Sequence, residues 1–131
     1  MARSSKIEWY DVGEMNQPIP NVTAEDVFRV VRREFESAWV AEAERLLGLY
    51  VEKEPFRVRL AALRIAGGDM KRLSDAVALA RLDYRDVLMA EYPRYGELDD
   101  GADDMVRTRA IETDWNEYHA WAGLGDGDRV Q

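Results

Sequence analysis

The clearest pattern of hydrophobic and polar positions lies in the middle of the chain. Apolar residues recur there every three or four positions, the spacing of one face of an α-helix; they are Met70, Leu73, Val77, Ala80, Tyr84 and Leu88. Asp69 can cap this helix, and Pro93 pushes the residue before it out of helical geometry. The pattern predicts one helix over 70–91, bent near Asp83 and Asp86. The alternative is a break there, with an aspartate starting a second helix.

Three other segments have the same helical period: residues 24–50, 55–66 and 104–122. Thr23, with an acidic residue three positions later, is suited to cap the first of them. Pro55 is accepted at the first position of a helix, and Gly67 can adopt the left-handed conformation that ends one. Asp103 or Asp104 can cap the last. The sequence predicts an all-α single domain, a loose bundle of four helices.

The two ends of the chain lack this period. Residues 1–22 contain glycine and proline after a short apolar run, and we expect an extended, non-helical arm. Its Trp9 and Tyr10 either dock on the helices or stay exposed as a contact for a partner. Residues 23–123 are the predicted helical domain, and the glycine-rich residues 124–131 are a predicted frayed tail.

The net charge of −8 is concentrated near the C-terminus. Residues 1–96 hold 16 acidic and 15 basic side chains, whereas residues 97–131 hold 10 acidic and 3 basic ones. Phosphate contacts need an excess of lysine and arginine, so direct binding to nucleic acid is disfavoured. The acidic excess favours a basic protein partner through electrostatic steering, although solubility alone would also account for it.

The cysteine count and the longest apolar runs suggest where the protein resides. The chain has no cysteine, which excludes disulfides, thiolate metal sites and a cysteine nucleophile, and which fits a reducing cytoplasm. We find no signal peptide and no apolar run near the roughly 20 residues that span a bilayer. We therefore expect a soluble, cytoplasmic protein without membrane contact.

The sequence offers little chemistry for metals or catalysis. The acidic loop after Gly96 contains five carboxylates: Glu97, Asp99, Asp100, Asp103 and Asp104. Counted from Asp99, its sixth residue is Asp104 where a calcium loop needs glycine. His119 is the only histidine, no zinc-binding HExxH pattern accompanies it, and we expect it on the polar surface of the last helix. We predict no cofactor, no metal site and no catalytic residue.

Residues 83–95, with the sequence DYRDVLMAEYPRY, hold the densest mixture of charged and aromatic side chains. Arg85 lies between two aspartates, and Glu91 with Arg94 is a second candidate ion pair. We expect a network that fastens helix ends together, with the last helix packed against the DYRD stretch. The predicted members of this structural network are Asp83, Arg85, Asp114, Trp115 and Tyr118.

The candidate partner-binding residues come from this stretch, the acidic loop and the arm: Asp86, Glu91, Tyr92, Tyr95, Glu97, Asp99, Asp100, Asp103, Asp104, Trp9 and Tyr10. Our leading hypothesis is a small, acidic, non-enzymatic protein that binds a basic protein. Immunity proteins to bacterial toxins and phage-encoded inhibitors of host defence share this build. One alternative is an enzymatic or small-ligand module that uses Asp83, Asp86 and Glu91, beside Tyr84, as acid and base. Another is a self-associating subunit, a homodimer in which the arm swaps onto a second copy.

Three stretches, RLAALRIAGGDMKRL, DYRDVLMAEYP and DWNEYHAW, resemble a group of small, mostly bacterial helical proteins of unassigned function. The resemblance covers about residues 22–122, and its most specific parts are residues 83–93 and 114–121. It implies an all-helical single domain. It brings no activity, cofactor or catalytic residue with it.

Overall fold

The computed structural model describes residues 18–125, and all regular structure within this range is helical. The elements are α1 (Ala24–Glu34), α2 (Ser37–Leu47), α3 (Pro55–Ala66), α4 (Met70–Leu82), α5 (Tyr84–Leu88), the 3-10 helix η2 (Met89–Glu91), α6 (Pro93–Gly96) and α7 (Asp104–Ala122). The predicted all-α class is therefore confirmed for this part of the chain. No helix among the described residues is both long and apolar enough to cross a membrane.

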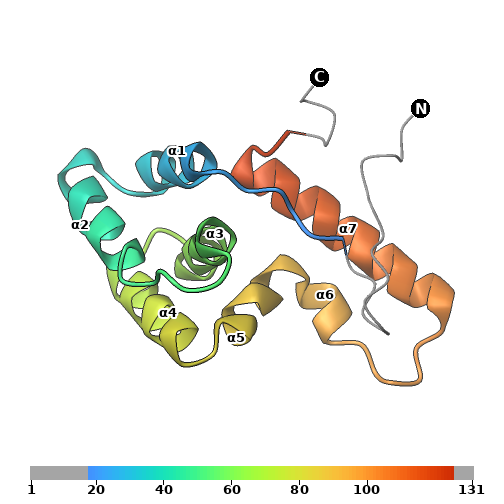
Figure 1. Ribbon diagram of the computed structural model, residues 1–131. Helices are drawn as coiled ribbons and strands as arrows, with labels where there is room; N and C mark the ends of the chain where they lie inside the picture. Colours follow the sequence, from blue (N-terminus) through green and yellow to red (C-terminus); the bar gives the residue numbers. More distant parts are fainter. Residues whose placement is uncertain (1–17, 126–131) are drawn as a thin grey trace.

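The helix α3 is the centre of the fold. Figure 1 shows it nearly end-on, with α1, α2, α4 and α5 around it, and it packs against α1, α4, α5 and η2. Its sequence suits this position because apolar side chains fall on most sides of the helix. The buried ones are Val58, Leu60, Ala61, Ala62, Leu63 and Ala66. The shorter helices therefore bury their apolar faces against a shared central element.

The predicted helix over 24–50 is wrong, because the chain leaves helical geometry after Glu34. Phe35 is extended, with φ −124° and ψ 145°, and its side chain is buried. The helix resumes as α2, which ends at Leu47 and packs against both α1 and α4. A continuous helix of this length would carry α2 past the core. Burial of Phe35 at the corner favours the break.

The single helix predicted over 70–91 is also wrong, and the alternative break occurs at Asp83. This residue has φ −156° and ψ 98°, and its carboxylate accepts a hydrogen bond from the backbone N–H of Arg85. The chain then continues as α5 and η2, and Pro93 starts α6, a short helix that was not among the four predicted. With two of the four predicted helices divided, the four-helix count does not hold for residues 18–125.

The connection between α3 and α4 matches the prediction and shows why it contains two glycines. Gly67 ends α3 in the left-handed region, with φ 57°, and Asp69 caps α4 by accepting from the N–H of Arg72. Gly68 has φ 86°, and a Cβ there would lie 3.1 Å from the backbone oxygen of Glu34. The glycine therefore lets this turn approach the end of α1.

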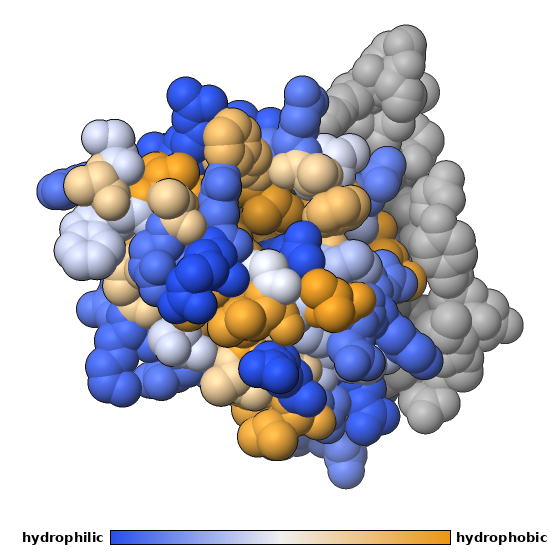
Figure 2. Space-filling model, turned by 60° about the vertical axis from the view of Figure 1, so that its left-hand side comes forward, coloured by the Kyte–Doolittle hydropathy of each residue, from blue (hydrophilic) through white to orange (hydrophobic). Residues whose placement is uncertain are grey.

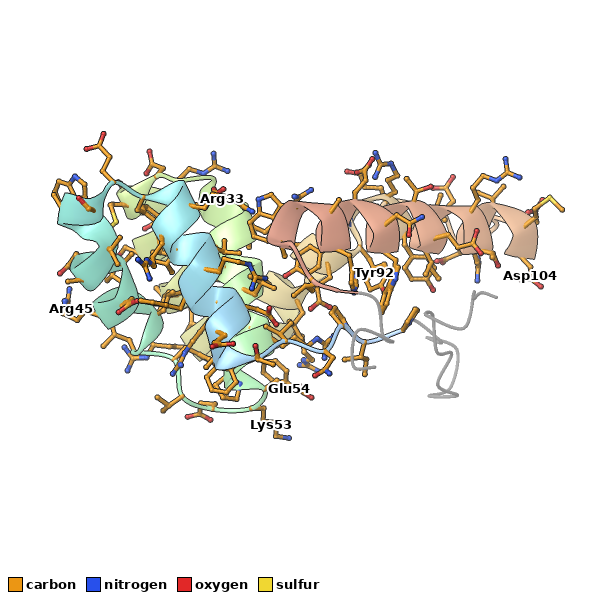
Figure 3. All side chains as sticks on the ribbon, turned by 90° about the horizontal axis from the view of Figure 1, so that it is seen from above. Arg33, Arg45, Lys53, Glu54, Tyr92 and Asp104 are labelled. Atoms are coloured by element: carbon orange, nitrogen blue, oxygen red, sulfur yellow. The ribbon has the colours of Figure 1, made fainter. Side chains whose placement is uncertain are left out.

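The helix α7 has the bounds predicted from sequence and forms one edge of the molecule. It packs against α6 and η2, and Figure 3 shows its Asp104 end extending beyond α1–α4. At its other end, Arg29 Nη2 donates to the backbone oxygens of Ala122 and Gly123 at 2.9 and 3.1 Å. Arg33 donates to the backbone oxygen of Trp121. Two arginines of α1 thus satisfy carbonyls left open at the end of the last helix.

Residues at both ends of the described range, within the predicted arm and the predicted tail, are buried. Residues 1–17, with Trp9 and Tyr10, lie outside the described residues. Pro18 and Pro20 are buried against the helical domain. Leu124, placed in the predicted frayed tail, is also buried, and its N–H donates to the backbone oxygen of His119.

Candidate functional site

An apolar groove of about 430 Å³ lies beside α5, η2 and α6. Its lining residues are Pro18, Ile19, Arg57, Arg85, Leu88, Met89, Glu91, Tyr92, Tyr95 and Gly96. We call it the α5–α6 groove. Ile19 and Met89 are 43 % and 58 % exposed, so apolar side chains are presented to a ligand as well as buried. The chain breaks at Asp83 before α5, and Pro93 starts α6, so the groove lies along a run of three short helical elements.

An ion pair between Arg57 and Glu91 lies in the wall of this groove. Arg57 Nε and Nη2 each donate to one oxygen of Glu91 at 2.9 Å, and the two side chains are 17 % and 1 % exposed. Burial raises the pKa of the Glu91 carboxyl, and the guanidinium opposes that rise. Burial lowers the pKa of Arg57, but Glu91 raises it further, so the net shift is upward.

The upward pKa shift of Glu91 favours a neutral carboxyl, whereas that of Arg57 favours an ionised pair. We assign the ionised pair, because two parallel N–H donors facing both carboxylate oxygens are the usual arrangement of a charged arginine–carboxylate bridge. The predicted pair of Glu91 with Arg94 is wrong. Glu91 is also buried, so the prediction that it contacts a partner directly does not fit its position.

Tyr92 holds the segment at Pro18 against the groove. Its hydroxyl donates to the backbone oxygen of Pro18 at 2.6 Å, and the residue is 5 % exposed. Burial raises the pKa of this hydroxyl, so the tyrosine stays a neutral donor. Figure 3 labels Tyr92 below α7. The prediction that Tyr92 contacts a partner is not supported by this geometry, whereas Tyr95, also in the lining, is half-buried and open to the groove.

A second buried carboxylate fastens α7 to α6. Asp114 is 1 % exposed and accepts from Arg94 Nη1 at 3.1 Å and from the backbone N–H of Tyr95 at 3.0 Å. Arg94 also donates to both oxygens of Glu117, at 2.7 and 3.0 Å. Asp114 therefore binds residues 94 and 95, and not the DYRD stretch against which the last helix was predicted to pack.

The aromatic residues of α7 pack both within that helix and against the core, which includes Tyr118 and which Trp121 contacts. Trp115 stacks on His119 with ring centroids 3.9 Å apart, and His119 Nδ1 lies 2.8 Å from the backbone oxygen of Trp115. The Tyr118 ring lies 5.6 Å from that of Trp121. The Tyr118 hydroxyl is buried and has no hydrogen-bond partner among residues 18–125. His119 is half-buried, so its predicted place on the polar surface holds only in part.

The carboxylates of the enzymatic alternative do not line a single cavity. Asp83 pairs with Arg85 at 3.1 Å, and hydrogen bonds from that guanidinium hold the pKa of Asp83 below its usual value. Asp83 lines a separate depression of about 440 Å³ with Tyr84, whereas Glu91 lines the α5–α6 groove. Asp86 is exposed and lines neither cavity. This arrangement offers no paired acid and base facing one substrate.

The acidic segment, residues 97–104, begins where the groove ends at Gly96. Its five carboxylate residues are exposed, and none of them forms an ion pair with another residue of the described range. Asp103 is the predicted cap of α7 and accepts from the N–H of Val106 at 2.9 Å. Among residues 18–125 no group of side chains is arranged to hold a metal ion.

The sequence did not identify Ile19, Met89 or Arg57 as parts of the site. Met89 lies off the predicted apolar stripe. An apolar residue outside such a stripe can indicate a binding surface, and this was the one signal in the sequence for the groove. Such exposed apolar residues are common elsewhere on the surface, as on the face in Figure 2, where hydrophobic areas are interspersed with hydrophilic ones.

In comparisons with family models, curated proteins and solved structures, no match to the chain was found. The resemblance noted from the sequence stays a prediction.

Proposed function

We propose that the protein is a non-enzymatic interaction module that binds a basic protein partner through the α5–α6 groove. The observation that carries this proposal is the apolar groove of about 430 Å³ that ends at the acidic segment. A partner segment with an apolar side chain followed by lysine or arginine would complement both features.

The groove walls suit a side chain of a partner protein. Leu88, Met89 and Ile19 supply an apolar surface that water solvates poorly, and filling it removes that surface from water. Met89 is unbranched and flexible, a residue type that adapts to partners of different shape. Cavities of this size bury most of a small apolar group while a few polar groups fix its orientation.

Charge favours a basic partner over a neutral one. Residues 97–131 carry 10 acidic and 3 basic side chains, and the acidic segment forms no ion pair within the described residues that would neutralise it. Such a surface steers cations toward the neighbouring groove and raises the association rate, an effect that added salt reduces.

The use of the other carboxylates supports binding over catalysis. Glu91 and Asp114 are both buried and each accepts two hydrogen bonds from fixed donors. A carboxylate held in this way serves the packing of helices and is poorly placed to exchange protons with a substrate. We therefore favour the interaction hypothesis over the enzymatic one.

A library of displayed random peptides, selected for binding to the full-length protein, tests this proposal. We expect selected peptides to combine an apolar residue with lysine or arginine, and to bind the Met89→Asp variant at least about tenfold more weakly. Met105→Asp is the matched control, since Met105 is a 70 % exposed methionine on α7 outside the groove lining. Peptides that bind both variants equally, or that show no basic enrichment, would contradict the proposal.

A further inference from the structure

The chain itself forms one wall of the α5–α6 groove. Pro18 and Ile19 line the groove, and the hydrogen bond from Tyr92 to the backbone oxygen of Pro18 holds this wall in place. The described chain therefore enters the helical domain at Pro18, at the edge of an apolar cavity. A tethered segment at this point encounters the groove before any separate molecule does.

We propose that residues 7–12 of the same chain, with the sequence IEWYDV, are the resident occupant of the groove and compete there with the partner. These residues lie outside the described range, and their sequence and their attachment at Pro18 favour this contact. They combine Trp9 and Tyr10 with two branched aliphatic residues. An aromatic side chain can bury about 150–250 Å², and the groove of about 430 Å³ has the apolar walls to receive one.

The connecting residues are long enough for this contact. Seven residues separate Tyr10 from Pro18, and each step of the chain spans at most about 3.3–3.6 Å. That length lets the segment double back into a groove that starts at Pro18, and Gly13 tolerates the tight turns needed. A short tether gives an effective concentration on the order of millimolar, so even a weak site is substantially occupied.

The segment shares the apolar part proposed for the partner but not its charge. Arg3 and Lys6 precede the apolar residues, whereas Glu8, Asp11 and Glu14 give residues 1–17 three acidic side chains against two basic ones. The segment therefore fills the groove through its apolar side chains, and a basic external ligand, attracted by the acidic segment, must displace it. The competition rests on the proposed function, whereas occupancy of the groove by residues 7–12 does not.

A spin label tests occupancy in the full-length protein. The chain has no cysteine, so Ser5→Cys provides one attachment site for a nitroxide. We expect the label to broaden the amide signals of Met89 and Gly96 selectively, with Arg45 on α2 unaffected. Replacing Trp9 and Tyr10 with serine should remove the effect, and Met89→Asp should weaken it while Met105→Asp leaves it intact. Absence of selective broadening at the groove would overturn the proposal.

Mixing experiments separate this contact from one between two copies. Spin-labelled protein without ¹⁵N is mixed with unlabelled ¹⁵N protein, and an intramolecular contact predicts no broadening. Broadening that arises only in the mixture would place a second copy in the groove and overturn the proposal. A displayed peptide should bind the Trp9→Ser/Tyr10→Ser variant about tenfold more tightly than the parent protein. Equal affinity would contradict the competition, whereas a failure to select any groove-binding peptide would count against the proposed function alone.

Discussion

Removing the guanidinium of Arg57 should destabilise the protein far more than removing an exposed one. Arg57→Met retains an apolar stem of similar length but leaves the Glu91 carboxylate, 1 % exposed, without its two hydrogen bonds of 2.9 Å. Breaking one side of a buried pair typically costs about 3–5 kcal/mol. Domains of this size are stable by roughly 5–15 kcal/mol, so the loss should be a large part of the total.

Arg45→Met is the matched control. Arg45 pairs with Glu42 on α2, and both side chains are largely exposed, at 60 % and 42 %. Exposed pairs contribute little to stability, because solvent screens the charges and ordering the side chains costs entropy. Urea denaturation followed by circular dichroism gives the free energy of unfolding of each variant. A deficit in Arg57→Met no larger than in Arg45→Met would refute the reasoning.

The pH dependence provides a second measurement of the same pair. Burial raises the folded-state pKa of Glu91 above the ordinary 4.5, so the folded protein binds this proton more tightly than the unfolded chain does. Such a group favours folding at acid pH, and that contribution is lost as the pH rises through the folded pKa. Arg57 opposes the loss in the parent protein. The deficit of Arg57→Met should therefore be smaller near pH 4.5 than near pH 7.5, values chosen to lie at and above the ordinary pKa.

A double variant distinguishes an unpaired charge from lost packing. Arg57→Met/Glu91→Leu removes both charges, and apolar replacement of a buried pair is often nearly neutral. We expect the double variant to recover most of the stability that Arg57→Met loses. A double variant as unstable as the sum of the two single variants would show that the pair does not act as a unit.

Three further changes test local features of the fold, each by urea denaturation. Tyr118→Phe should leave the free energy of unfolding unchanged or raise it, because the buried hydroxyl has no partner within residues 18–125; a loss above about 1 kcal/mol would reveal a hydrogen bond to that hydroxyl. Glu54→Gly should stabilise by about 1 kcal/mol, because Glu54 precedes α3 with φ 52°; destabilisation would mean that its side chain matters more than its backbone. Thr23→Ala should cost about 0.5–2 kcal/mol by removing the acceptor for the N–H of Asp26, whereas Thr23→Ser, which keeps an oxygen there, should cost less.

The parts of the fold that could be predicted from sequence are those with local signals. Pro55 and Gly67 delimit α3, and the bounds of α7 follow from Asp103 and the glycine after Ala122. The break at Phe35 has no such signal, since neither glycine nor proline lies there. It comes from burial against the central helix, which is a long-range effect.

The candidate site divides in the same way. Composition alone identified the acidic segment, but Arg57 and Glu91 are 34 positions apart, and no local pattern joins them. The closeness of Glu91 and Arg94 in the sequence led to the wrong prediction that these two residues pair. The change from η2 to α6 at Tyr92 alters the helical phase between them, so one faces the core and the other faces α7.

The arginines of α1 that bind the carbonyls of Ala122 and Gly123 have a consequence for biosynthesis. Arg29 of α1 obtains these acceptors from the end of α7, 93 and 94 positions later in the chain. A nascent chain cannot make this closure until residues 122 and 123 have left the ribosome. Truncation within α7 should therefore leave α1 without these contacts, and this step of folding should wait until α7 has been synthesised.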